Sequence, residues 1–410
     1  MKFALIIIDG AADEPLAELG NKTPLQAANK PVIDSIARIG RLGTTRNVPA
    51  GMHPGSDVAI LSMLGYDPRS HYTGRAPLEA VAQGLQIDPD MWVLRCNLVT
   101  IVDGVMADYS AGHISTEEAR GLIAELNEQL SSSVVRFYGG ISYRHLLTVK
   151  ADLEVETTPP HDIMGRKIAE HLPRGQGAEL LIDLTQRSSA VLGGHEINAV
   201  RRDLGENLAS SIWLWGQGKK PQLESFASKY GRSAAVITAV DLVRGIAALT
   251  GMDSIAVDGA TGYVDTNYAG KGAAAVAALE DHDLVIVHVE APDECGHNAE
   301  PELKTRAIED IDRFIVSPIL HRLQAQSDGW RILLGPDHPT PCRLRTHTAD
   351  PVPFVIAGQD IPNLVSRPFD ETTCAQGDLH IEFGHELMEY LLKPARPGAA
   401  APAQGVGLGK

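Results

Sequence analysis

Three short apolar runs, each followed at once by acidic residues, constrain the fold of this chain more than any other feature. They are FALIIIDG near the start, DLVIVHVEAPDE at residues 283–294 and WRILLGPDH at residues 330–338. A continuous apolar run of this length is typical of a strand that is buried on both faces of a parallel sheet. Amphipathic helical stretches such as TPLQAANKPVIDSIARIG and PELKTRAIEDIDRFIVSPILHRLQAQ lie between the runs. The sequence therefore predicts an α/β fold with a mostly parallel central sheet.

The length of the chain and a change of pattern along it predict two domains. At 410 residues the chain is too long for one ordinary core. Residues 66–218 mix strand-like pieces with the helical stretch TEEARGLIAELNEQL and lack the pattern of a buried strand followed by an acid, so we expect an inserted second domain there. The first domain would then combine residues 1–65 and 219–395, and the tail 396–410, rich in Pro, Gly and Ala, is expected to be disordered.

The charge of the chain argues against large anionic partners. Lys and Arg number 36 and Asp and Glu number 52, which gives a formal charge of 36 − 52 = −16. Neither nucleic acid nor a membrane is expected as a partner, because both call for a basic face, and no apolar stretch approaches the roughly 20 residues of a membrane span. A small anion stays compatible, since a metal or a few arginines can reverse the field inside a cleft. The four cysteines lack CxxC spacing, and the first apolar run ends at Asp9, too early for a signal peptide, so we expect a cytoplasmic protein.

The ends of the three apolar runs carry residue types that bind metal ions. Carboxyl ends of neighbouring parallel strands meet at one edge of a sheet, where open α/β sheets bind ligands. Three carboxylates and three imidazoles suit Mn²⁺ or Zn²⁺, whereas Mg²⁺ prefers oxygen ligands alone. Six ligands exceed what one open catalytic ion needs, so we predict two divalent metal ions, with Mn²⁺ favoured over Mg²⁺, Co²⁺ or Zn²⁺. Each residue alone could instead be a turn, cap or surface residue, and only their joint placement favours a metal site. The candidate ligands are Asp9, Asp293, His297, Asp337, His338 and His347.

Ser56 lies in the stretch AGMHPGSDVAILSMLG, behind a Pro-Gly pair and ahead of an apolar helical run. It could be a helix N-cap, since a serine there accepts a hydrogen bond from the first turn. It could also be a nucleophile at the positive end of a helix dipole. The candidate metal ligands favour the nucleophile, because two cations against a serine oxygen would activate it, and capping stays compatible with that role.

Ordered sequence blocks run along nearly the whole chain: IIIDGAAD, NVPAGMHPGSDVAILSMLGYDP, YTGRAPLEA, SAGHISTEEA, TPPHDI, GATGYVDTNY, VHVEAPDECGH, DHPTP and HTADPVPF. These blocks resemble those of the 2,3-bisphosphoglycerate-independent phosphoglycerate mutases of the archaeal type, within the alkaline phosphatase superfamily. The resemblance implies an alkaline-phosphatase-like core with an inserted α+β lid domain that closes over the substrate. It implies an isomerase of glycolysis and gluconeogenesis that interconverts 2- and 3-phosphoglycerate through a phosphoserine.

The resemblance also implies roles for individual residues. Ser56 would be the phosphate acceptor. One metal ion would be held by Asp9, Ser56, Asp337 and His338, and the other by Asp293, His297 and His347. The substrate, a small phosphorylated hydroxy acid, would contact Arg75, Arg95 and Arg144 in the insert, with His113 and His161 as hydroxyl- or proton-handling groups. His113 stands where the resemblance leads us to expect an arginine, and His288, inside the apolar run VIVHVEA, is interpreted as structural.

Two other activities are compatible with the same core. A metal-dependent phosphomonoesterase would result if water reached the phosphoserine, and a homoserine-kinase-like phosphotransferase would result if the insert bound another small hydroxy acid or amino acid. The metal ligands are the same in all three cases, so only the specificity residues of the insert separate them.

Overall fold

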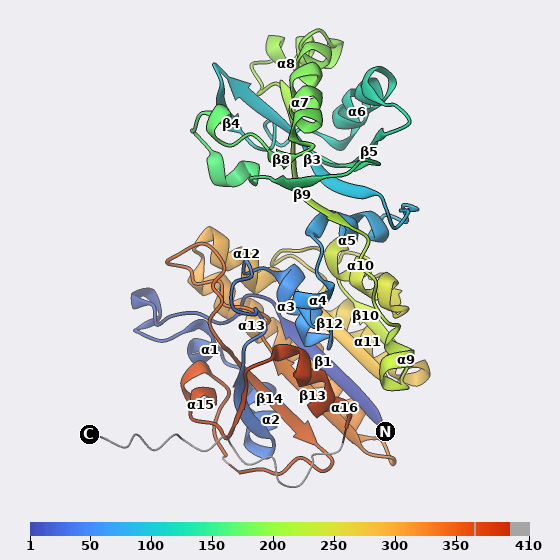
Figure 1. Ribbon diagram of the computed structural model, residues 1–410. Helices are drawn as coiled ribbons and strands as arrows, with labels where there is room; N and C mark the ends of the chain where they lie inside the picture. The colour runs from blue at the N-terminus through green and yellow to red at the C-terminus, as the bar shows by residue number, and fades with distance from the viewer. Residues whose placement is uncertain (365, 394–410) are drawn as a thin grey trace, which may run out of the picture. The chain divides into compact units, whose positions relative to one another are not determined.

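The computed structural model describes residues 1–364 and 366–393, which divide into two compact units (Figure 1). Unit 1 contains Met1–Ser70, Glu224–Val240 and the described residues from Gly251 onward. Unit 2 contains His71–Leu223 and Asp241–Thr250. The predicted disordered tail, residues 396–410, lies outside the described residues.

Unit 1 is built on an eight-stranded sheet. Five of the seven neighbouring pairs are parallel, and β14 runs antiparallel to both of its neighbours. This confirms the predicted α/β class with a mostly parallel sheet. In spatial order the strands are β11 (Asp253–Ile255), β10 (Ala234–Ile237), β12 (Leu284–Val289), β1 (Lys2–Ile8), β13 (Trp330–Gly335), β14 (Val352–Gly358), β2 (Arg41–Thr45) and β15 (Leu379–Ile381).

The three apolar runs form the neighbouring strands β12, β1 and β13, as predicted. The register pairs Ile8 with Val289 and Ile7 with Gly335, so the chain leaves all three strands at the same edge. Alternate side chains of a strand point to opposite faces of its sheet. Ala4, Ile6 and Ile8 belong to one core cluster, and the intervening residues of β1 are buried as well. Burial on both faces explains why the sequence of this strand is apolar without interruption.

Helices cover the core cluster of unit 1, and one predicted helical stretch is interrupted. Residues 23–40 form two helices, because Lys30 precedes Pro31 and takes a non-helical conformation, with φ −126° and ψ 63°. Between α13 and α14 a π-helical turn spans Asp312–Val316. The helices are α1 (Pro24–Ala27), α2 (Pro31–Ile39), α3 (Ser56–Met63), α9 (Phe226–Tyr230), α11 (Tyr268–Asp281), α12 (Ala291–Asn298), α13 (Pro301–Ile311), α14 (Ser317–Gln324), α15 (Glu371–Ala375) and α16 (Leu387–Leu392), and α4 (Pro68–His71) ends where the units meet in sequence.

Unit 2 contains a separate, antiparallel sheet with helices packed on it, which confirms the predicted α+β class of the insert. Leu94, Cys96 and Leu98 of its central strand belong to a core cluster that also contains side chains of α6 and α7. A small second sheet pairs β7 with β8. The elements are α5 (Arg75–Ala82), β3 (Trp92–Val102), β4 (Val105–Asp108), α6 (Thr116–Leu130), β5 (Val135–Ile141), β6 (Arg144–Val149), β7 (Glu154–Glu156), β8 (Arg174–Gln176), α7 (Ala178–Gly193), α8 (Glu196–Asp203), β9 (Ser211–Lys219) and α10 (Asp241–Thr250).

None of the helices in the described ranges combines the length and the apolar composition that crossing a membrane requires.

Candidate active site

The seven residues that the sequence analysis nominated as metal ligands lie close together in unit 1. Asp9 follows β1, Asp337 and His338 follow β13, and Asp293 lies in α12 directly after β12. Two groups of side chains can each converge on one point, with ligand atoms within 4.8 Å of one another. These groups are Asp293, His297 and His347, and Asp9, Asp293 and His338. Asp293 belongs to both groups and therefore lies between them.

Ser56 is the first residue of α3, and its side chain faces the second of these groups. The N-cap position is occupied by Gly55, and no side chain caps the helix. The capping role considered for Ser56 is therefore wrong, because the serine lies inside the first turn, where its hydroxyl cannot reach back as a cap. Its Oγ instead lies 3.1 Å from Nε2 of His338. The hydroxyl is half-buried and sits at the positive end of the helix.

The hydrogen bonds of His338 direct its Nε2 lone pair toward this serine. Thr340 donates its hydroxyl hydrogen to Oδ1 of Asp293, so its oxygen can accept from Nδ1 of His338 at 3.3 Å. The Nε2 atom then lies 3.3 Å from Oδ2 of Asp337 and 3.5 Å from Oδ1 of Asp9. Neither of these two carboxylate oxygens has a hydrogen-bond partner among the described residues, although both are buried.

The other group is oriented in the same way by backbone carbonyls. A carbonyl oxygen only accepts, so Nδ1 of His297 must donate to the carbonyl of Arg345 at 3.0 Å, and Nδ1 of His347 to that of Pro54 at 3.4 Å. The two Nε2 atoms then lie 2.9 Å apart and 3.3 and 3.4 Å from the Asp293 carboxylate. Metal-binding histidines usually donate their other ring N–H in this manner.

The charges of the site also fit divalent cations. Burial, followed by the negative charges of Asp337 and Asp293, raises the pKa of Asp9 well above its ordinary value. Although burial opposes it, hydrogen bonds from His297 and His347 hold the pKa of Asp293 well below its ordinary value. The hydrogen bond and charge of Asp293 outweigh burial and raise the pKa of His297 to about 9. The donor set suits ions that accept both nitrogen and oxygen.

The backbone at Gly10 passes close to Asp293 and Asp337, which belong to the candidate metal site. Gly10 has φ +62°, and a Cβ atom at this position would lie 2.5 Å from Oδ1 of Asp293, so no larger residue fits. Its N–H donates to Oδ1 of Asp337 at 3.1 Å. Behind the site, the fully buried Lys304 donates to the carboxylate of Asp13 and to the carbonyl of Thr340, both at 2.8 Å. These contacts tie the loop after β1 to the loop after β13.

The three nominated arginines lie near one another in unit 2. The register places Trp215 opposite Arg95 and Arg144 opposite Asn97, and Arg95 and Asn97 share the face of β3 that lies away from the apolar core. Glu79 accepts from Nε of Arg75 at 3.1 Å and from Nε of Arg95 at 3.0 Å. Burial and the positive charges of Arg75 and Arg144 lower the pKa of Arg95 to about 10, against the opposing charge of Glu79.

Aromatic rings connect these arginines to both nominated histidines. The guanidinium of Arg95 lies 4.3 Å from the ring centroid of Trp215, and the His161 ring lies 5.3 Å from the same side chain. The ring centroid of Tyr109 lies 6.2 Å from that of His161 and 5.6 Å from that of Tyr143. The ring centroid of His113 lies 6.1 Å from that of Tyr143. His113 and His161 are exposed, and His113 has a left-handed φ of 51°. The structure therefore groups all five nominated substrate residues in unit 2.

Sequence reasoning missed several residues that hold these groups. His288 hydrogen-bonds Asp9, Thr340 bridges Asp293 and His338, and Glu79 links two arginines. A signal was present for Glu79, which stands four residues after Arg75 and thus on the same face of a helix. A signal was also present for His288, an ionisable residue within the apolar run VIVHVEA. Thr340 had none, because its contact with Asp293 joins the loop after β13 to a helix that is distant in sequence.

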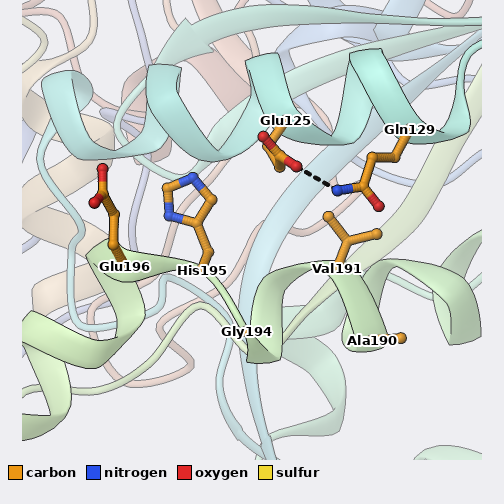
Figure 2. Close-up of a pocket in the computed structure, with 7 residues that line it drawn as sticks. All are labelled: Glu125, Gln129, Ala190, Val191, Gly194, His195 and Glu196. Atoms are coloured by element: carbon orange, nitrogen blue, oxygen red, sulfur yellow. Dashed lines mark hydrogen bonds between the residues drawn. The ribbon is translucent and has the colours of Figure 1, made fainter.

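A pocket of about 610 Å³ in unit 2 lies apart from all of these residues. Figure 2 shows Glu125 and Gln129 of α6 on one side, hydrogen-bonded to each other, and side chains of α7 and of the start of α8 on the other. His195 caps α8, because its Nδ1 accepts from the N–H of Ile197 at 3.1 Å. None of the nominated site residues lines this pocket.

Comparisons with known proteins agree with the architecture of both units. The family model described as 2,3-bisphosphoglycerate-independent phosphoglycerate mutase matches residues 37–198. A protein of that name from Methanothrix thermoacetophila is 49% identical and is covered over its whole length by 96% of this chain. A protein structure from Pyrococcus horikoshii, 31% identical, superimposes with a TM-score of 0.82 over 97% of this chain and 99% of that one. The cofactor-independent phosphoglycerate mutase from Thermoplasma acidophilum, 28% identical, gives a TM-score of 0.65 over 96% and 99%.

Identity of this extent over nearly the full length of both chains cannot come from a shared fold alone, and it covers the strand ends as well as the insert. The chain belongs to the family of 2,3-bisphosphoglycerate-independent phosphoglycerate mutases.

Proposed function

We propose that this protein interconverts 2-phosphoglycerate and 3-phosphoglycerate through a phosphoserine at Ser56, without 2,3-bisphosphoglycerate. The observation that carries the proposal is the position of the Ser56 hydroxyl, 3.1 Å from Nε2 of His338 and beside two convergent groups of metal-binding side chains. An isolated serine hydroxyl is a poor nucleophile at neutral pH. The family to which the chain belongs supports the choice of this reaction over other phosphoryl transfers.

The residues of unit 1 would hold two divalent cations, for which Mn²⁺ is our proposal. Asp9, Asp337, His338 and Ser56 would hold one, and Asp293, His297 and His347 the other, with Asp293 close enough to contribute to both. When bound, such cations lower the pKa of a coordinated hydroxyl and offset charge on a transferring phosphoryl group.

The proposed phosphoryl transfer needs no reactant other than the chain and its substrate. A bond forms between Oγ of Ser56 and phosphorus while the phosphorus–oxygen ester bond of the substrate breaks. The proton that the serine loses is matched by the proton that the released glycerate oxygen gains. The reverse transfer to the other glycerate hydroxyl completes the isomerisation. The first turn of α3 stabilises the negatively charged phosphoserine, because its amide groups and its dipole favour an anion.

Unit 2 would hold the glycerate part of the substrate. Arg75, Arg95 and Arg144 bring positive charge close together, and Glu79 contacts two of them through Nε. The forked N–H donors of a guanidinium suit a carboxylate or phosphate. His113 and His161 could contact the glycerate hydroxyls. Closure of the inserted domain over the substrate as a lid stays a prediction.

A single assay tests this function. The purified chain is incubated with 3-phosphoglycerate and Mn²⁺, without 2,3-bisphosphoglycerate, and phosphorus NMR follows the products. Conversion to 2-phosphoglycerate is expected. Release of inorganic phosphate would indicate a phosphomonoesterase instead. In a second incubation with ATP and homoserine, phosphorylation of homoserine by a chain without mutase activity would indicate the kinase-like alternative.

Arg95→Met should weaken substrate binding more than it slows the chemical step. Charged hydrogen bonds of this kind contribute about 1.5–3 kcal/mol, so KM should rise by about 10- to 100-fold, and kcat should fall less. Arg187→Met is the matched control, because Arg187 pairs with Asp183 on the exposed surface of α7. Steady-state kinetics in both directions measure the effect. An unchanged KM for Arg95→Met would remove this residue from the substrate site.

A further inference from the structure

A buried line of hydrogen bonds runs across three neighbouring strands behind Asp9. His288 lies in β12 with 1% of its surface exposed, opposite Ile7 in the register with β1. Its Nδ1 lies 3.0 Å from Oγ1 of Thr238, which follows β10, and its Nε2 lies 2.7 Å from Oδ2 of Asp9. The strand order β10–β12–β1 explains why Thr238, His288 and Asp9 form a row.

The donors and acceptors of this row have a definite order. The Asp9 carboxylate only accepts, so Nδ1 of His288 is left as the acceptor for the Thr238 hydroxyl, whose oxygen also accepts from the N–H of Val240 at 3.0 Å. The imidazole then carries its hydrogen on Nε2 and donates it to Asp9. Lys271 donates to the His288 carbonyl at 3.3 Å.

The row determines which oxygen of Asp9 is available. Oδ2 is engaged by His288, whereas Oδ1 is buried, has no hydrogen-bond partner among the described residues and lies 3.5 Å from Nε2 of His338. An unpartnered buried carboxylate oxygen is costly unless a cation reaches it. A carboxylate that is free to rotate would lose conformational entropy on binding an ion, and a carboxylate already fixed through its other oxygen loses less.

We propose that His288, oriented by Thr238, is a positioning residue that fixes the Asp9 carboxylate with Oδ1 toward the cation. The proposal rests on the metal site of the proposed function but not on the reaction that it serves. Partners that orient a metal ligand typically change affinity by about 10- to 100-fold when they are removed. A histidine that merely filled the core would affect folding alone.

The test measures Mn²⁺ binding by calorimetry on purified protein stripped of metal, with no substrate present. His288→Leu should weaken one of two Mn²⁺ binding events by about 10- to 100-fold, and His288→Gln, which keeps an N–H donor, should recover most of the affinity. Thr238→Val should weaken the same event, and Thr238→Ser should bind as the wild type does. His145→Leu is the matched control, because His145 is equally buried but lies in unit 2.

Two results would overturn the proposal. One is a folded His288→Leu protein that binds both ions with wild-type affinity, and the other is a loss in His288→Gln as large as that in His288→Leu. If His288→Leu does not fold, the comparison of Thr238→Val with Thr238→Ser decides. Equal Mn²⁺ affinities of these two variants would contradict the orientation of His288 by Thr238. A chain that binds Mn²⁺ as expected but lacks mutase activity would refute the proposed function and leave this inference standing.

Discussion

Ser56→Ala is expected to abolish phosphoryl transfer, with a loss in kcat on the order of 10⁴-fold or more. The substitution removes the only oxygen in the proposed reaction that can form the covalent intermediate, and loss of a nucleophile is among the largest effects a single substitution has on an enzyme. Mn²⁺ should still bind, more weakly, because Asp9, Asp337 and His338 remain. Coupled assays of both directions, together with mass spectrometry for a phosphorylated serine, measure the result.

Ser62→Ala is the matched control for this substitution. Ser62 lies in the same helix, is 1% exposed, and has no hydrogen-bond partner for its hydroxyl among the described residues. Replacing an unsatisfied buried hydroxyl by a methyl group is close to neutral for stability, so Ser62→Ala should keep wild-type activity. Retained turnover in Ser56→Ala, or absence of phosphate on Ser56 in the wild type during turnover, would exclude the phosphoserine.

The strand ends could be predicted from the sequence because burial on both faces leaves a pattern that needs no long-range information. The runs that became β1, β12 and β13 are apolar except for Lys2, His288 and Arg331, and an acid or a glycine stands at the end of each run. Adjacency of these strands was not readable from the pattern. It was inferred from the general rule that ligands bind at the carboxyl edge of such sheets, and the register confirms it.

Contacts between loops and between faces could not be predicted in the same way. Thr340 bridges Asp293 and His338 across the sheet edge, and His288 holds Asp9 from a neighbouring strand. Each contact depends on register, which a single sequence leaves open. The N-cap of α3 was misassigned for a local reason, since serine is a common capping residue and Gly55 is a less common one. The alternation in β3, which places Arg95 and Asn97 opposite the apolar core, was readable in principle from the period of two.

Asp293→Asn should remove both metal ions, whereas His297→Ala should remove one. Asp293 belongs to both convergent groups, and its two oxygens contact His297 and His347 at 3.3 and 3.4 Å. Asparagine carries no charge, so the variant lacks the carboxylate that both groups share as a ligand.

Elemental analysis after dialysis against limiting Mn²⁺ should find well under one ion per chain for Asp293→Asn and about one for His297→Ala, with mutase activity lost in both because both cations act on the same transfer. His385→Ala, a partly exposed histidine of unit 1 that pairs with Asp67, is the control and should keep both ions. If Asp293→Asn instead retained one tightly bound ion, Asp293 would not contribute to the ion held by Asp9, Asp337 and His338. Because Asp337 Oδ2 lies 3.3 Å from Nε2 of His338, Asp337→Asn would then remove the remaining ion, which makes the two arrangements distinguishable by metal content alone.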